Sequence, residues 1–292
     1  MLKTETKKIT IAHSPDADDA FMFYALSKEI IKSDKFSFEH TLKDIQTLNT
    51  EADSLKYDVQ AISFFAYPDI QDKYQLMSCG GSLGNGYGPM VISCRDVVHY
   101  VSTTDEITAL KGKTIAVPGE KTTAFLLLKL FLKDFTPIVV PFDQIIDSVK
   151  NGKHDFGLII HEGQLSYLKH GLYKVVDLGE WWLGKTNLPV PLGGNVIKRS
   201  LPESEKKEIN SLIKQSIQYG ISNKSTVVPA VSNYARELES SNDLVTKFVS
   251  MYVNDFTIDY GISGKLGIKK LYELALKEGL IKEIPVLDFV DS

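Results

Sequence analysis

Short apolar stretches in this chain end repeatedly at polar or glycine-containing turns, and a helix pattern follows each turn. In the first part of the chain, strand patterns at residues 8–12, 36–43 and 57–64 alternate with helix patterns at residues 18–30 and 45–55. Parallel strands need a crossover between them, and a helix is the usual crossover. This order therefore predicts a wound, parallel α/β sheet.

A second set of alternating patterns follows a glycine-rich segment at residues 79–89. Its strand patterns lie at residues 114–117, 138–140, 155–160 and 173–177. A segment marked by proline and glycine, residues 188–194, then leads to one more strand pattern. From residue 204 onward the chain is mostly helical, which returns it to the first set of elements in the predicted layout.

This layout predicts a type II periplasmic-binding-protein-like fold, in which two α/β lobes close on a ligand in the cleft between them. Lobe one comprises residues 1–93 plus 196–292, and lobe two comprises residues 94–195. The two hinge crossings are predicted near residues 91–96 and 189–196. A length of 292 residues is more than one simple core needs and suits two lobes.

Composition narrows the expected partners to small molecules. The net charge is -4 and the basic residues are scattered, so we expect no nucleic-acid partner. Residues 1–10 lack an apolar signal-peptide core, and no stretch of about 18 uncharged apolar residues occurs, so we expect neither secretion nor a membrane span. We therefore expect a cytoplasmic protein, with free thiols at Cys79 and Cys94 and a small-molecule substrate. Both a monomer and a homodimer are compatible with the sequence.

Histidine is the natural base near neutral pH, and the chain has six. His161 follows the apolar run FGLII, which places it at the carboxyl end of a predicted buried strand, where open α/β sheets bind their ligands. His13 ends the first strand and is either a cleft residue or a structural one. Glu162 is a doubtful partner for His161, because consecutive strand residues point to opposite faces. Four histidines in polar or turn-like contexts are expected at the surface: His40, His99, His154 and His170.

Hydroxyl side chains follow three other predicted strands. Thr122 and Thr123 stand where a strand gives way to a helix, and free N–H groups at a helix start bind anions to which hydroxyls add donors. Helix capping is the alternative role for these threonines, and the two roles are compatible. Ser14 and Ser63 end the first and third strands, where a turn or cap is the alternative. Together with His161, these residues are predicted to converge on one cleft.

Three further patterns have a simpler structural explanation. Gly84, Gly86 and Gly88 precede a strand rather than a helix, so a flexible turn is favoured over a dinucleotide site. The paired Trp181 and Trp182 are expected to pack, although a place at the cleft entrance is the alternative. Three acidic residues lack the spacing of metal ligands and are expected to complement the dipole of the first helix: Asp16, Asp18 and Asp19.

Five motifs identify a family resemblance. They are SPDADDAFMF at residues 14–23, GNGYGP at 84–89, PGEKTTA at 118–124, IHEG at 160–163 and LPVPLGG at 188–194. Together they resemble the 1,4-dihydroxy-6-naphthoate synthase family of the futalosine route to menaquinone, over residues 8–200 by motif and over the whole chain by layout. The IHEG motif is the most specific. One departure is SPDADD where family members often read SPCPND, so that Asp16, Ala17 and Asp18 replace Cys, Pro and Asn.

The resemblance implies a carbon–carbon lyase with a small carboxylated substrate. It converts cyclic de-hypoxanthine futalosine to 1,4-dihydroxy-6-naphthoate without a metal or a redox cofactor. The family's catalytic histidine carries over to His161 as the general base of a fragmentation. The family's substrate contacts carry over to five positions: Ala61, Ile62, Ser63, Thr122 and Thr123. A solute-binding protein of the same fold and a chorismate dehydratase are the alternatives, and the effector lobe of a regulator is a more distant one.

Overall fold

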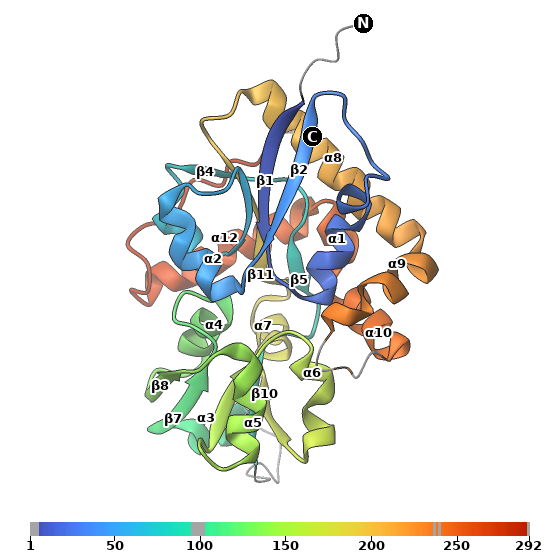
Figure 1. The fold of residues 1–292 in the computed structure, drawn as a ribbon. Helices are drawn as coiled ribbons and strands as arrows, with labels where there is room; N and C mark the ends of the chain where they lie inside the picture. The colour runs from blue at the N-terminus through green and yellow to red at the C-terminus, as the bar shows by residue number, and fades with distance from the viewer. Residues whose placement is uncertain (1–5, 95–102, 236–237, 239–240, 291–292) are drawn as a thin grey trace, which may run out of the picture. The chain divides into compact units, whose positions relative to one another are not determined.

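The computed structural model describes residues 6–94, 103–235, 238 and 241–290. It forms two compact α/β units, and each unit is built on its own β-sheet rather than on a share of one continuous sheet (Figure 1). The first unit comprises residues 1–83, 193–262 and 285–292. The second unit comprises residues 84–192 and 263–284.

The first unit contains a six-stranded mixed sheet. Its strands are β1 (Lys7–His13), β2 (Phe36–Leu42), β3 (Val59–Ser63), β4 (Tyr74–Leu76), β5 (Ser82–Gly84) and β11 (Val190–Lys198). The order is β2–β1–β3–β11–β4, with β5 paired to β11. β1 is parallel to β2 and β3, whereas β11 is antiparallel to β3 and β4. The parallel strands predicted from the sequence are therefore confirmed, and their carboxyl ends lie at one edge of the sheet.

Helices of the first unit cover this sheet with apolar faces. They are α1 (Ala17–Ser27), α2 (Ile45–Glu51), α8 (Glu203–Ser222), α9 (Lys224–Val231), α10 (Asn242–Tyr252) and α11 (Asp255–Ile258). Among the described residues, short 3₁₀ turns lie at Ala52–Ser54, Tyr67–Asp69 and Ser232–Tyr234. α1 packs against α8, α9 and α10. Phe21 and Phe23 of α1 are buried, as are Ile9 and Ile11 of β1, so the apolar residues of the first strand–helix pair form the core of this unit.

The second unit contains a five-stranded sheet of order β10–β6–β9–β7–β8. The strands are β6 (Met90–Ser93), β7 (Lys113–Val117), β8 (Phe135–Val139), β9 (Phe156–Ile159) and β10 (Tyr173–Asp177). β7 is parallel to β8 and β9, and β6 is antiparallel to β9 and β10. Its helices are α3 (Thr103–Leu110), α4 (Thr123–Phe131), α5 (Ile145–Lys150), α6 (Gly163–Ser166), α7 (Leu178–Thr186) and most of α12 (Gly261–Lys277), with 3₁₀ turns at Phe142–Gln144 and Tyr167–His170.

The division differs from the predicted lobes, 1–93 plus 196–292 and 94–195, at both crossings and near the C-terminus. β6 pairs with β9 and β10, so the second unit begins at Gly84, within the glycine-rich segment, instead of after residue 93. Residues 263–284 also belong to the second unit. Gly267 of α12 packs against Pro189, and Glu278 forms an ion pair with Lys133 at 2.6 Å. Pairing and packing, rather than the turn signals, set these boundaries.

The glycine-rich segment is a tight turn that packs on the start of α7. A Cβ on Gly88 would lie 3.0 Å from the Cα and N atoms of Gly179, and a Cβ on Gly179 would lie 2.1 Å from the carbonyl carbon of Tyr87. Two backbones approach closely here because neither glycine has a side chain. Next to this contact, Trp182 is fully buried and donates its indole N–H to the Pro189 carbonyl at 3.2 Å, so the predicted packing role of this tryptophan is confirmed.

Two details of the helical part differ from the sequence prediction. The sequence predicts a helix at residues 226–238 with Pro229 in its first turn, whereas α9 begins at Lys224 and has Pro229 inside it. A proline has no N–H to donate, and α9 ends two residues after it, at Val231. The helix α7 lies in a region where the sequence analysis identified only the tryptophan pair.

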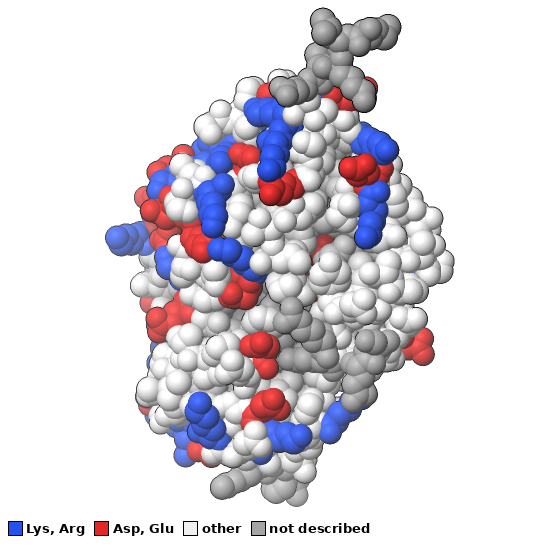
Figure 2. All heavy atoms as spheres, in the orientation of Figure 1, with Lys and Arg blue, Asp and Glu red and all other residues white. Residues whose placement is uncertain are grey.

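On the face drawn in Figure 2, basic and acidic side chains are interspersed, which is typical of a solvated surface. Among the described residues, no helix has both the length and the apolar composition to cross a bilayer.

Candidate functional site

Three parallel strands of the second unit end at the same edge of their sheet. β7 and β9 are neighbours, with Ile115 opposite Phe156 and Ala116 opposite Gly157, and β8 lies on the other side of β7. Parallel neighbours place their carboxyl ends together. The turn before α4 and the turn that holds His161 therefore lie at one edge of this unit, as the sequence predicts.

His161 stands in the turn between β9 and α6. β9 ends at Ile159, and the backbone of His161 has a φ of 60°, which is the left-handed region. A non-glycine residue in this region costs on the order of 1–3 kcal/mol and persists only where its surroundings hold it. The imidazole packs edge-on against Phe142, which follows β8, with ring centroids 5.0 Å apart. The backbone thus holds this histidine in a strained conformation at the ligand edge of the sheet.

Glu162 does not lie on a strand, so the alternation argument that set it aside is wrong. It is the N-cap residue of α6, its φ and ψ are already helical, and its carbonyl accepts the N–H of Leu165 at 2.9 Å. Its side chain is buried. The apolar pattern predicts a strand to Ile160, whereas β9 ends at Ile159 and the left-handed residue at 161 ends the extended backbone.

Thr122 is the N-cap of α4, which confirms the capping alternative for this residue. Its hydroxyl accepts the N–H of Phe125 at 3.2 Å and donates its proton to the Gly119 carbonyl at 2.8 Å. A hydroxyl has one proton, so in this geometry Thr122 has none left for a ligand. Thr123 begins α4 and is also buried.

Ser14 follows β1 at the carboxyl edge of the first sheet and is held by two aspartates. Its hydroxyl donates to Asp16 at 2.5 Å, and its backbone N–H donates to Asp19 at 2.7 Å. Asp16 is also the N-cap residue of α1, and Asp18 and Asp19 lie in the first turn of that helix. The acidic residues therefore stand at the helix start, as predicted, and two of them also fix the turn that carries Ser14.

Ser63 ends β3 at the same edge and is held by Asn49 of α2. The Asn49 side chain accepts the Ser63 N–H at 2.8 Å and donates to the Ser63 hydroxyl at 2.9 Å. Ala61 and Ile62 pair with Asn195 and Gly194 of β11, and their side chains are buried. The sequence analysis missed Asn49, because a single asparagine in a short polar helix has no pattern that marks it as buried.

The buried His13 and the partly buried His40 form a pair beside this edge. The Nδ1 atom of His13 lies 2.9 Å from the Ser14 carbonyl, and its Nε2 atom lies 3.3 Å from Nδ1 of His40. The His13 ring stacks on Phe23 with centroids 4.6 Å apart. Burial, and then the neighbouring His40, lower the pKa of His13 to about 4, against the opposing effects of the Ser14 carbonyl and Asp16. Both rings are therefore neutral at pH 7, because burial also lowers the pKa of His40.

This pairing bears on two predictions from the sequence: the open role of His13 and the surface position of His40. His13 takes the structural alternative, since both of its ring nitrogens face protein atoms. His40, predicted at the surface, is partly buried, because its ring packs against His13 and Phe23. His154 and His170 are both partly buried, and His99 lies outside the described residues.

Two other buried titratable groups have raised pKa values. Asp177 caps α7 by accepting the N–H groups of Gly179 and Glu180, and burial raises its pKa to about 6. Cys79 is a free, buried thiol, and burial raises its pKa to about 12, so it stays protonated and unreactive. Within the part of the chain that the structure describes, no group of three or more His, Cys, Asp or Glu side chains is arranged to hold a metal ion.

Comparison with known proteins identifies full-length relatives. A family model described as menaquinone biosynthesis matches residues 9–277. The 1,4-dihydroxy-6-naphthoate synthase of Thermus thermophilus is 34% identical over 277 residues, which cover 95% of this chain and 97% of the relative. The protein of the same name from Streptomyces coelicolor is 33% identical over 279 residues, with 94% of each chain covered.

Solved structures agree on the fold. Protein AF1704 from Archaeoglobus fulgidus is similar with a TM-score of 0.87 and 43% identity, over 94% of this chain and 98% of that one. The alkanesulfonate-binding protein SsuA from Xanthomonas axonopodis pv. citri is similar with a TM-score of 0.69 and 11% identity, over 97% of each chain. A Candida albicans protein described as having the generic periplasmic binding protein fold has a TM-score of 0.66 and 16% identity, over 95% of this chain and 92% of that one. The predicted fold class is thereby confirmed.

Proposed function

Since this chain belongs to the menaquinone biosynthesis family, we propose that it is a 1,4-dihydroxy-6-naphthoate synthase, a carbon–carbon lyase. Two relatives that match nearly its full length have this name, which supports the assignment. The substrate in this proposal is cyclic de-hypoxanthine futalosine, as the motif resemblance implies. The location in this proposal is the cytoplasm, and cell fractionation tests it.

The base in this proposal is His161. The observation that carries it is the left-handed backbone of this histidine at the carboxyl end of β9, because strained residues of this kind persist where the surroundings hold them and are concentrated at active sites. A neutral imidazole accepts a proton in water at neutral pH without a cofactor. Phe142 packs edge-on against the ring and limits its movement.

The reaction in this proposal is a retro-aldol-like fragmentation. The imidazole takes a proton from a substrate hydroxyl, and the released electron pair forms a carbonyl as the neighbouring carbon–carbon bond breaks. The electron pair of that bond moves into the conjugated ring system, and the imidazolium returns the proton there. The ring then becomes aromatic, which makes the step favourable. No electrons enter or leave, so the chemistry requires no oxidant or reductant.

In this proposal, each unit contributes substrate-binding groups at the strand ends of its own sheet. Ser63 provides a hydroxyl, and the strand residues Ala61 and Ile62 contribute backbone atoms because their side chains are buried. The start of α4, with Thr123, provides a helix N-terminus for an anionic group. Ser14 completes this set as an acceptor, because its own proton is donated to Asp16.

The test is incubation of the purified protein with cyclic de-hypoxanthine futalosine and analysis of the product by mass. Formation of 1,4-dihydroxy-6-naphthoate supports the proposal. Binding of the compound without turnover would instead identify a solute-binding protein. Elimination of the enolpyruvyl group from chorismate, assayed in parallel, would identify a chorismate dehydratase. Gel filtration with light scattering distinguishes the monomer from the homodimer.

A further inference from the structure

We propose that Asn49 is a positioning residue that turns the hydroxyl proton of Ser63 outward, so that Ser63 donates to a carboxylate oxygen of the substrate. The inference rests on the proposed function, since it deepens the role of Ser63 in substrate binding. It concerns only the first unit, where Asn49 lies on α2 and Ser63 ends β3.

The orientation of the Asn49 amide is fixed by its partners. The backbone N–H of Ser63 is only a donor, so the Asn49 atom 2.8 Å from it is the amide oxygen. The amide nitrogen then faces the Ser63 hydroxyl at 2.9 Å and donates to it. The hydroxyl oxygen of Ser63 is thus an acceptor toward Asn49, and its own proton points elsewhere. None of the described residues accepts that proton, although the Ser63 side chain is only 4% exposed.

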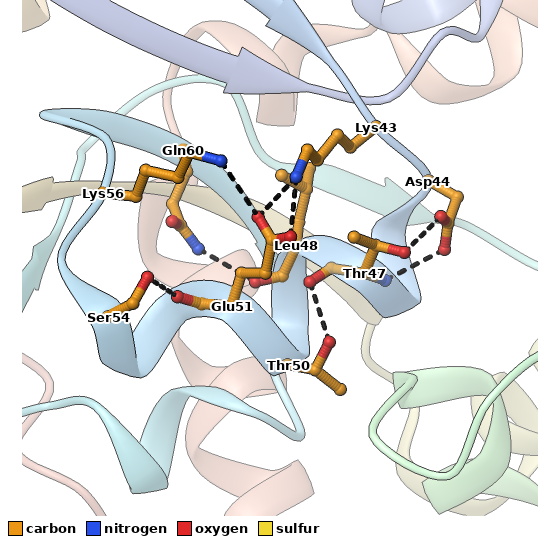
Figure 3. A network of polar contacts seen from close by, with 9 residues as sticks. All are labelled: Lys43, Asp44, Thr47, Leu48, Thr50, Glu51, Ser54, Lys56 and Gln60. Atoms are coloured by element: carbon orange, nitrogen blue, oxygen red, sulfur yellow. Dashed lines mark hydrogen bonds and ion pairs between the residues drawn. The ribbon is translucent and has the colours of Figure 1, made fainter.

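Side-chain contacts hold both ends of the helix that carries Asn49 (Figure 3). At its start, the Asp44 carboxylate accepts the backbone N–H of Thr47 at 2.9 Å and the Thr47 hydroxyl at 2.5 Å. At its end, Lys43 forms an ion pair with Glu51 at 2.6 Å.

The strand that ends at Ser63 is tied to the same helix. In its middle, Gln60 of β3 donates to the Leu48 carbonyl, one residue before Asn49, at 3.3 Å (Figure 3). The amide is therefore held on a short helix that cannot rotate freely relative to β3.

Two other hydroxyls that were predicted to bind substrate already donate their protons to acceptors in the protein. Ser14 donates to Asp16, and Thr122 donates to the Gly119 carbonyl. Ser63 differs from both, because its polar neighbour is a donor instead of an acceptor. A ligand oxygen that accepts the Ser63 proton gains a hydrogen bond without breaking one in the protein. A carboxylate is the strongest such acceptor, since hydrogen bonds to charged groups are the stronger ones.

The decisive variant is Asn49→Asp, which keeps the shape of the side chain and reverses one hydrogen bond. One carboxylate oxygen still accepts a hydrogen bond from the Ser63 N–H, but the other oxygen now accepts one from the Ser63 hydroxyl. We expect the KM for cyclic de-hypoxanthine futalosine, and the Kd for the carboxylate 1,4-dihydroxy-6-naphthoate, to rise at least about tenfold at pH 7, with kcat changed less than about threefold. Thr50→Asp is the matched control for added charge, because Thr50 is the next residue of α2 and is exposed; its KM should stay within about twofold.

A pH series separates orientation from structure. A protonated carboxyl donates like the native amide, so binding by Asn49→Asp should recover relative to wild type between pH 7 and pH 5, as burial raises the pKa of the introduced carboxyl above its usual value of about 3.9. Relief of charge also contributes to this recovery. The same pH series in an Asn49→Asp, Ser63→Ala double variant measures the charge contribution alone, and we expect the recovery there to be smaller.

Different failures point to different errors. If Ser63→Ala binds within about twofold of wild type, Ser63 does not bind substrate, and the proposed site loses this contact together with the role of Asn49. If Ser63→Ala weakens binding but Asn49→Asp does not, the positioning role is wrong and the proposed function stands. If Asn49→Asp fails to fold, Asn49→Ala replaces it. Because the hydroxyl is then free to rotate, KM should rise about two- to fivefold without pH recovery, and an unchanged KM would contradict the proposal.

Discussion

The carboxyl edges of the two sheets hold their functional side chains in different ways. In the first unit, side-chain hydrogen bonds set the directions of the hydroxyls: Asp16 accepts a hydrogen bond from the Ser14 hydroxyl, and Asn49 donates one to the Ser63 hydroxyl. In the second unit, the backbone sets the direction of the histidine, because His161 stands in a left-handed turn directly after β9. The first edge is therefore sensitive to the identity of a neighbouring side chain, and the second is sensitive to the residue that occupies one backbone position.

The two units also differ in their buried titratable groups. The first unit buries a neutral histidine, His13, whose pKa is lowered to about 4. The second unit buries an aspartate, Asp177, whose pKa is raised to about 6. Burial disfavours the charged form of both groups. Because one group gains a charge in acid and the other loses one, acid is expected to destabilise the first unit at His13 and to stabilise the second at Asp177.

The largest expected effect comes from His161→Asn. Asparagine tolerates the left-handed backbone better than most residues, so the turn should persist while the basic nitrogen is lost. We expect kcat for cyclic de-hypoxanthine futalosine to fall about 10²–10⁴-fold, with a smaller change in KM. Activity of the native protein should also fall in acid, because imidazolium cannot accept a proton. A folded His161→Asn protein with near-native turnover would exclude His161 as the base.

The next largest effect is expected from His13→Asn, which tests how the stability of the first unit changes in acid. The unfolded pKa of about 6.5 lies above the folded value of about 4, so the unfolded chain binds more protons between these values. Stability is therefore fully present above pH 6.5 and is lost as pH falls toward 4, by roughly 3 kcal/mol for this group. Asparagine keeps a donor for the Ser14 carbonyl and does not titrate. Thermal unfolding measured from pH 7.5 to pH 4 should show that the variant loses less stability in acid than wild type does. An identical dependence of stability on pH would show that His13 does not control the acid response.

Asp177→Asn in the second unit is expected to change the pH dependence of stability slightly less, and in the opposite direction. The folded pKa of about 6 lies above the model value of 3.8, so the stability that Asp177 contributes is fully present below pH 3.8 and is lost as pH rises through 6. Asparagine is an equally good N-cap and carries no charge. We expect the variant to be more stable than wild type at pH 7, by at most about 3 kcal/mol, and similar to it near pH 4. Denaturant unfolding at the two pH values measures this, and an equal change at both would contradict the pKa shift.

The smallest effect separates the two threonines at the start of α4. Thr122→Val removes the N-cap and should cost about 0.5–2 kcal/mol of stability, with little change in affinity, because its proton is already donated to Gly119. Thr123→Val keeps the cap and should weaken substrate binding if Thr123 donates to an anionic group, by about 1.5–3 kcal/mol. Unfolding midpoints and Kd values for both variants make the comparison. If Thr122→Val weakens binding more than Thr123→Val does, the roles assigned to them are reversed.

The order of elements and the histidine at a strand end were predictable from the sequence. Apolar runs such as FGLII can only be buried strands or helix segments, and the polar turns that follow them mark where a parallel strand ends. The motif that contains His161 carried the family resemblance, and the relatives confirm that family over nearly the whole chain. These features are local, so a few consecutive residues contain the necessary information.

The partners of each side chain were decided only by the tertiary structure. Asn49 reaches Ser63 across 14 positions, His40 reaches His13 across 27, and Glu278 reaches Lys133 through a helix that the sequence assigned to the other lobe. Strand pairing and helix packing bring these groups together, and no local pattern encodes which strands or helices become neighbours. The sequence therefore determined which residues stand at strand ends, whereas the packing determined which hydroxyl keeps a proton to donate and which histidine stays neutral.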